Sequence, residues 1–186
     1  MTTWNNGKYM LLRGFAKDSC DIKNFQKLAD STVLHRYHKG IGNSLRSVIA
    51  NSDLAIYKFL EKNSSTIRQA VEKKFRFDKL IMQYALNQMK HGDGIDMHND
   101  WFDLNETHHP DAIVARGILT LNPTYVFGTD TYASEDKNSF IKEFGGYPGD
   151  LFIFKCSPDS WHSVGFKKEN HVDRFSMNFV FKLKHP

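Results

Sequence analysis

The clearest alternation of apolar and polar residues lies near the C-terminus, in residues 174–183. Side chains of a strand leave opposite faces in turn, so positions 174, 176 and 178 share a polar face. The other face carries large apolar side chains: Phe175, Met177, Phe179 and Phe181. This pattern predicts a strand that buries one face in a core. Shorter apolar runs predict further strands at residues 8–15, 80–87, 116–121, 124–127 and 151–154.

The part of the chain before Phe75 shows a different pattern, with apolar residues three and four positions apart, which is typical of amphipathic helices. Asn63 and the two serines after it are expected to end one helix and cap the next, because such side chains favour helix ends. The glycines in residues 36–43 predict a loop. Helices are predicted from Asp18 or Ser19 through Ala29, from Asn43 or Ser44 to about Ala50, from about Ser52 to Glu61, and from Ser64 or Ser65 to Phe75.

Helices followed by short strands indicate an α+β fold. We expect the strands to close into a sandwich or jelly roll and the N-terminal helices to pack on one sheet. The length of 186 residues predicts a single domain, residues 1–186, with residues 1–77 as a mainly helical support and residues 78–186 as the core. Residues 128–147 form a long polar stretch, for which a lid and a surface loop are the two interpretations.

Composition indicates a folded protein in a reducing setting. Apolar residues make up 40% and charged residues 25%, which is typical of globular proteins. The net charge of +4 and the pI of about 9.0 permit contact with an anion or a nucleic acid without requiring it. Two cysteines, Cys20 and Cys156, make no disulfide framework. The apolar run at residues 9–12 is too short for a signal peptide or a membrane span, so we expect a cytoplasmic protein without membrane contact.

Residues 98 and 100 place two metal-binding side chains on one face, if this segment is extended. His98 offers an imidazole and Asp100 a carboxylate, and a spacing of two puts both on the same side of a strand. His162, far along the chain, is the candidate for the third ligand. Two histidines and one carboxylate that leave open coordination positions are typical of non-haem Fe(II) oxygenases.

Arg174 begins the last predicted strand, and Ser176 follows it on the same face. An arginine can pair with a carboxylate through two hydrogen bonds, and a nearby hydroxyl adds another. This pair is what is needed to hold the distal carboxylate of 2-oxoglutarate while its other end chelates a metal. The alternative is an ordinary surface ion pair at a strand end, which contributes little to stability.

These segments resemble the Fe(II)/2-oxoglutarate-dependent dioxygenases, and most closely their prolyl-hydroxylase-like and AlkB-type branches. The pattern Asn-x-Met-x-x-Gly-x-x-Ile-x-x-His-x-Asp at residues 87–100 is similar to the family's, and similar segments follow in order at residues 117–122, 125–131, 148–154 and 161–164. The likeness covers about residues 8–183. It implies a double-stranded β-helix (jelly roll) that binds Fe(II) and converts 2-oxoglutarate and O₂ to succinate and CO₂ while it oxidises a substrate.

The resemblance also implies roles for single residues. Many relatives have a tyrosine where this chain has Met89, so we expect Asn87 or Tyr84 to help bind 2-oxoglutarate instead. The metal ligands implied are His98, Asp100 and His162, and the 2-oxoglutarate ligands are Arg174 and Ser176 with Asn87 or Tyr84. Apart from the resemblance, candidates for the substrate pocket are Trp101, Arg116 and Asn178. The alternatives are core packing for Trp101, a surface position at a strand end for Arg116 and a hydrogen bond to a neighbouring loop for Asn178.

The substrate stays open at this point. The small size favours hydroxylation of an aliphatic C–H in an amino acid, free or within a peptide. One alternative is AlkB-type oxidation of nucleic acid, which the pI permits, although AlkB-type enzymes tend to carry a second arginine where this chain has Val180. The other alternative is a jelly-roll domain that binds without catalysis.

Overall fold

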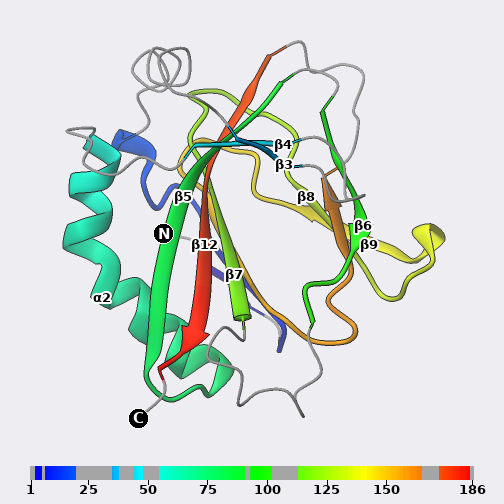
Figure 1. Cartoon of the computed structure of the whole chain (residues 1–186), viewed down its shortest axis with the longest axis horizontal. Helices are drawn as coiled ribbons and strands as arrows, with labels where there is room; N and C mark the ends of the chain where they lie inside the picture. The colour runs from blue at the N-terminus through cyan, green and yellow to red at the C-terminus, as the bar shows by residue number, and fades with distance from the viewer. Residues whose placement is uncertain are drawn as a thin grey trace.

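The computed structural model describes residues 3–5, 7–19, 35–37, 44–47, 55–90, 93–101, 113–164 and 172–184. These residues form two antiparallel β-sheets and one long α-helix (Figure 1), which confirms the predicted α+β class. The larger sheet has the order β1 (Thr3–Asn5), β2 (Tyr9–Leu12), β10 (Leu151–Lys155), β7 (Ile113–Thr120), β12 (Arg174–Leu183), β5 (Leu80–Met89), β4 (Ser44–Ser47) and β3 (His35–Tyr37). The smaller sheet has the order β6 (Ile95–His98), β11 (His162–Val164), β8 (Thr129–Tyr132) and β9 (Phe140–Phe144).

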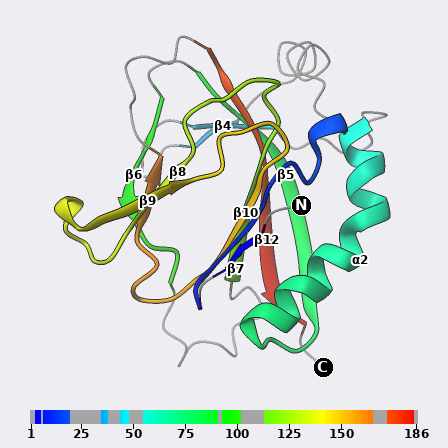
Figure 2. The same cartoon turned by 180° about the vertical axis from the view of Figure 1, so that it is seen from behind.

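Strand β12 organises the larger sheet, because it pairs with β5 along its whole length and with β7 on its other side. Its apolar face is buried, as the alternation predicts, and contributes Phe175, Met177, Phe179 and Phe181 to the main core. Helix α2 (Ala55–Phe75) adds its own apolar residues to this core. Figures 1 and 2 show α2 along the side of the larger sheet that faces away from the smaller one.

Helix α2 continues through residues 63–65, which corrects the break predicted there. The side chain of Asn63 donates from Nδ2 to the carbonyl of Phe59 at 2.8 Å, and Oγ of Ser64 donates to the carbonyl of Glu61 at 3.1 Å. These polar groups therefore bond back to their own helix. The buried stripe outweighs their weak preference for helix ends, and it consists of Ile56, Leu60, Ile67, Val71 and Phe75.

Two further predictions for the N-terminal part are wrong. The segment expected to begin a helix at residue 44 is strand β4, in which Leu45 lies opposite Gln88 of β5. Residues 36 and 37, expected in a loop, belong to β3, which pairs with β4. Pairing of β4 with β5, and of β3 with β4, gives these backbone groups partners that a local helical tendency does not match. The helix predicted from residue 18 lies outside the described residues except for the 3-10 turn η1 (Lys17–Ser19), and the division at residue 77 stays a prediction.

The other predicted strands correspond to β2, β5, β7, β10 and β12, with one exception. Residues 124–127 form a loop in which the N–H of Val126 donates to the carbonyl of Gly146 at 2.9 Å. The N–H of Gly128, two residues further on, donates to Oε1 of Glu143 at 2.8 Å. The polar stretch 128–147 is not a plain surface loop, because it contains β8, the 3-10 turn η3 (Lys137–Ser139) and β9, and the two strands pair as a hairpin.

Aromatic side chains join the two sheets. One buried cluster draws on both of them and consists of Tyr9, Leu11, Phe144, Phe152 and Phe154. Within it, the rings of Phe144 on β9 and Phe152 on β10 stack at 4.7 Å with an interplanar angle of 7°. A smaller cluster contains Met89, Phe127 and Val164. No helix in the described part of the chain is long and apolar enough to cross a membrane.

Candidate metal centre

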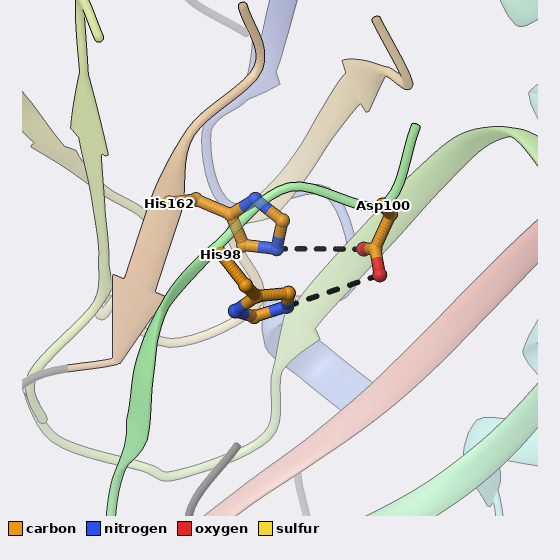
Figure 3. A group of neighbouring side chains, drawn as sticks. All are labelled: His98, Asp100 and His162. Carbon is orange, nitrogen blue, oxygen red and sulfur yellow. Dashed lines mark ion pairs between the residues drawn. The ribbon is translucent and has the colours of Figure 1, made fainter. Parts of the chain in front are cut away.

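Two neighbouring strands of the smaller sheet bring the predicted metal ligands together. His98 ends β6, His162 begins β11, and the two are paired across the antiparallel ladder. Cross-strand partners share a face, and the two rings lie with their centroids 4.2 Å apart. Asp100 follows β6 by two residues and turns its carboxylate toward both imidazoles (Figure 3). The pairing of β6 with β11 therefore brings two histidines and one carboxylate to the same place.

The separations between the aspartate and each histidine suit a shared metal ion. The Nε2 of His98 lies 3.8 Å from Oδ1 of Asp100, and the Nε2 of His162 lies 3.4 Å from Oδ2. All three ligand atoms lie within 4.8 Å of one another. Bonds of about 2.1 Å from a metal to nitrogen or oxygen allow two ligand atoms up to about 4.2 Å apart, so both measured separations fall inside this limit.

Backbone carbonyls orient both imidazoles. The Nδ1 of His98 lies 2.7 Å from the carbonyl oxygen of Asp96, and the Nδ1 of His162 lies 2.9 Å from that of Ser160. A carbonyl oxygen only accepts hydrogen bonds, so each Nδ1 carries a proton and donates it. Each Nε2 therefore keeps its lone pair on the side of Asp100, which is the tautomer that metal binding requires.

The electrostatics of the site favour the protonation states of metal ligands. Burial lowers the pKa of His98, and the neighbouring His162 lowers it further. Burial alone would raise the pKa of Asp100, but the imidazole of His162 and the guanidinium of Arg116 hold it well below its usual range. At neutral pH the site thus presents a neutral His98 and an ionised Asp100, which are the forms that bind a metal.

Arg174 is a buried cation without a carboxylate partner among the described residues. Its side chain is 3% exposed, and its Cζ lies 5.6 Å from the centre of the Phe127 ring. The Nη1 donates to the sulfur of Met89 at 3.5 Å, while Nε has no hydrogen-bond partner in the described part of the chain. Burial lowers the pKa of Arg174 to about 10, and the charge of Glu143 opposes this shift. Such a group is expected to require an anion, because an unpaired buried charge is costly.

Polar residues beside Arg174 belong to the same face of the larger sheet. Ser176 lies opposite Asn87 in the register of β12 with β5, and Arg174 lies opposite Met89. Asn87 is buried, and its Oδ1 has no partner among the described residues. The hydroxyl of Ser176 donates to Oδ1 of Asn178 at 3.1 Å. The structure therefore gathers Asn87, Ser176 and Arg174 on one surface, as the sequence predicts.

Solved structures with the same arrangement of strands are known, although no family model and no curated protein matches the chain. A prolyl-4-hydroxylase from Pseudomonas putida superposes with a TM-score of 0.71 at 14% identity, covering 95% of this chain and 93% of the other. The chain has the prolyl-hydroxylase fold of the 2-oxoglutarate oxygenases. This confirms the predicted double-stranded β-helix.

Two further structures extend this comparison. The viral collagen prolyl hydroxylase of Paramecium Bursaria Chlorella virus-1, in its complex with 2-oxoglutarate, gives a TM-score of 0.65 at 15% identity and covers 95% of this chain and 96% of the other. A prolyl hydroxylase from Trichoplax adhaerens, in complex with a peptide fragment of hypoxia inducible factor, gives a TM-score of 0.71 at 14% identity. The match covers 94% of this chain and 83% of the other. At such identities the likeness establishes the fold, while function must be argued from the site.

Within the prolyl-hydroxylase fold, Tyr84 lies on the wrong side of the sheet for its predicted role. Its ring lies 5.8 Å from that of Tyr57 on α2 and 5.9 Å from that of Phe179 in the main core. Asn87, three residues along β5, projects from the opposite face. Of the two residues predicted to take the place of the tyrosine in relatives, only Asn87 remains a candidate.

The three residues predicted for the substrate pocket occupy different surroundings. The Nε of Arg116 lies 2.7 Å from Oδ2 of Asp100, in an ion pair that adjoins the triad. The indole Nε1 of Trp101 is buried and has no partner among the described residues. Asn178 accepts the hydrogen bond from Ser176. Of the three, Arg116 is the one placed in direct contact with the triad.

Two aromatic residues of the site were not singled out from the sequence. Phe154 packs its ring against His162, with centroids 4.5 Å apart, and Phe127 lies beside the guanidinium of Arg174. Both sit in apolar segments that look like ordinary core. No local pattern distinguishes them, because their role depends on contacts across the two sheets.

Proposed function

We propose that this protein is an Fe(II)- and 2-oxoglutarate-dependent dioxygenase that hydroxylates an aliphatic C–H of an amino acid, free or within a peptide. The observation that carries this proposal is the meeting of His98, Asp100 and His162, with both Nε2 atoms and the carboxylate facing one another. A binding domain without catalysis has no need for this ligand set together with a buried arginine that has no carboxylate partner among the described residues.

The triad would hold Fe(II) through the Nε2 of His98, the Nε2 of His162 and the carboxylate of Asp100. Bound there, Fe(II) would supply the redox chemistry that couples oxidation of 2-oxoglutarate by O₂ to oxidation of the substrate. The protein's own task is orientation. The carbonyls of Asp96 and Ser160 hold the two rings in the required tautomer, and Phe154 restricts the ring of His162 by packing.

Arg174 would bind the distal carboxylate of 2-oxoglutarate. Its guanidinium is buried, and its described contacts are a sulfur and an aromatic ring. A carboxylate there would gain charge-assisted hydrogen bonds and would remove the cost of an unpaired buried charge. Ser176 and Asn87, whose Oδ1 has no partner among the described residues, lie on the same face and complete a polar surface for the cosubstrate.

The substrate class is supported by the similar structures. Three prolyl hydroxylases share the fold, and one of them holds a peptide. Trp101, Arg116 and Asn178 are the candidates for contact with the substrate. Action on nucleic acid remains the alternative, and salt-dependent binding of single-stranded DNA or RNA would be its first sign.

Turnover with a panel of free amino acids and short peptides tests the proposal. The purified protein would be incubated with Fe(II), 2-oxoglutarate and O₂, with succinate measured by mass spectrometry together with any substrate that gains an oxygen atom. We expect one class to raise succinate formation and to be hydroxylated, and the His98→Ala variant to form none. If both classes fail while single-stranded nucleic acid stimulates turnover, the substrate assignment is wrong.

A further inference from the structure

Arg116 stands beside the triad, and among the described residues most of its hydrogen-bonding capacity is unused. It lies on β7, opposite Phe154 of β10 and Val180 of β12, so neither cross-strand neighbour offers it an acceptor. Its described polar contact is the ion pair from Nε to Oδ2 of Asp100 at 2.7 Å. A guanidinium carries five N–H donors, so its Nη groups are left for another acceptor. The side chain is 23% exposed, which leaves part of it accessible.

The charges of the loaded site balance by themselves. Fe(II) brings two positive charges, and Arg116 and Arg174 bring one each. Asp100 brings one negative charge, 2-oxoglutarate brings two, and Glu143, whose charge acts on Arg174, brings one. What favours a further anion is the guanidinium of Arg116 itself: it is only 23% exposed, and a partly buried cation is stabilised by a second charged acceptor beside Asp100.

We infer that Arg116 binds a carboxylate of the substrate, so that the substrate is anionic where it meets the metal site. This inference rests on the proposed function and narrows it. The Nε edge of Arg116 stays on Asp100, and the Nη edge takes the substrate carboxylate in a charge-assisted, two-point contact. A carboxylate held there lies next to the metal ligand Asp100, which fixes the orientation of the bond to be oxidised.

Two sources can supply this carboxylate. In a free amino acid it is the α-carboxylate, and in a peptide it is the side chain of Asp or Glu. A peptide of neutral residues with blocked ends has neither. Arg116 therefore acts as a specificity-determining residue that separates these substrates from neutral peptide segments.

Binding without turnover tests the inference. The protein would be loaded with 2-oxoglutarate and Mn(II), which replaces Fe(II) and avoids oxidation, and each probe would be titrated by calorimetry. The first arm compares every proteinogenic amino acid as the free acid and as the primary amide. The second arm compares short peptides with blocked ends that carry Glu or Gln, or Asp or Asn, at one position.

We expect at least one acid to bind about tenfold more tightly than its amide, or more, which is the size of a hydrogen-bonded charge contact. The arm in which this occurs identifies the source of the carboxylate. Arg116→Gln should abolish the difference, and Arg116→Lys should retain part of it because it keeps the charge. The control is Arg68→Gln, which removes an arginine from the surface of α2, where Arg68 pairs with Glu72. This control should keep the full difference.

The outcomes separate the inference from the proposed function. If the wild type binds Mn(II) and 2-oxoglutarate but binds acids and amides equally, or binds no probe, the inference is overturned and the proposed function stands. The inference is likewise overturned if the wild type and Arg116→Gln prefer acids over amides by the same factor. If the wild type binds neither Mn(II) nor 2-oxoglutarate, the inference and the proposed function are both wrong. Should Arg116→Gln lose Mn(II), the comparison is made with Arg116→Lys, whose acid preference must then fall below that of the wild type.

Discussion

Replacement of Arg174 by methionine should reveal the buried cation as an anion site. Methionine keeps an unbranched apolar side chain that can follow the methylene groups of the arginine, and it removes the charge. Burial lowers the pKa of Arg174 from 12.5 to about 10, which corresponds to about 3 kcal/mol against the charged form. This cost to folding is present in full at all pH values below about 10 and is relieved only as the pH rises toward the unfolded value. We therefore expect the unliganded variant to be at least as stable as the wild type.

The same substitution should remove the effect of 2-oxoglutarate. At about 100 times its Kd, the cosubstrate stabilises the wild type by about 2.7 kcal/mol, or roughly 5–11 °C in Tm for a chain of this size. Loss of one partner of a buried charge pair costs about 2–5 kcal/mol, which weakens binding by about 30-fold or more. Arg174→Met should therefore show little rise in Tm at the same 2-oxoglutarate concentration.

The assay is thermal unfolding in the presence of Mn(II) with increasing 2-oxoglutarate. Lys182→Met is the matched control, because it removes a cation from the other end of β12, and it should respond to 2-oxoglutarate as the wild type does. An Arg174→Met variant that keeps the wild-type rise in Tm would refute the assignment of Arg174. So would an unliganded variant that is several kcal/mol less stable than the wild type, because Arg174 would then have a strong partner within the protein.

Three further outcomes follow from the contacts of the site. Burial lowers the pKa of His98, so below about pH 6.5 the unfolded chain binds a proton that the folded chain does not, and the metal-free protein should lose stability as the pH falls. Urea unfolding at several pH values should show a weaker dependence of the unfolding free energy on pH for His98→Gln. Phe154→Ala should cost about 3–5 kcal/mol by the urea midpoint and should weaken Mn(II) binding at His162, and a cost below about 1 kcal/mol would contradict its packing. Asn87→Ala should reduce the rise in Tm with 2-oxoglutarate while Tyr84→Phe leaves it unchanged, and equal effects would contradict the faces assigned to them.

The sequence predicts best where one pattern depends on one physical cause. The alternation in residues 174–183 identifies β12 because a strand with one buried face must place apolar residues at every second position. The triad is predictable because His98, Asp100 and His162 occur in the same order as in a known family, together with Arg174 and Ser176, and because a spacing of two fits an extended segment. Neither inference needs knowledge of which strands pair.

The failures occur where long-range contacts outweigh local preference. Residues 44–47 form β4 because β5 offers them backbone partners, and residues 63–65 stay helical because a buried stripe runs through α2 on both sides of them. The choice between Asn87 and Tyr84 could have been made from the sequence alone. Asn87 is two positions from Met89 and Tyr84 is five, so on a strand only Asn87 shares the face of Met89.

The contacts of Arg116, Phe127 and Phe154 could not be predicted in this way. Each depends on the packing of the two sheets against each other or on the register among β10, β7 and β12. An isolated arginine in a strand has no sequence signal that points to Asp100. The structure supplies that contact, and with it the partly exposed guanidinium from which the substrate carboxylate is inferred.

A crystal structure of the protein with Mn(II) and 2-oxoglutarate tests the central claim most directly. We predict one metal ion bound by the Nε2 atoms of His98 and His162 and by the carboxylate of Asp100, with the distal carboxylate of 2-oxoglutarate on Arg174. A metal bound elsewhere, or 2-oxoglutarate placed away from Arg174, would contradict the account.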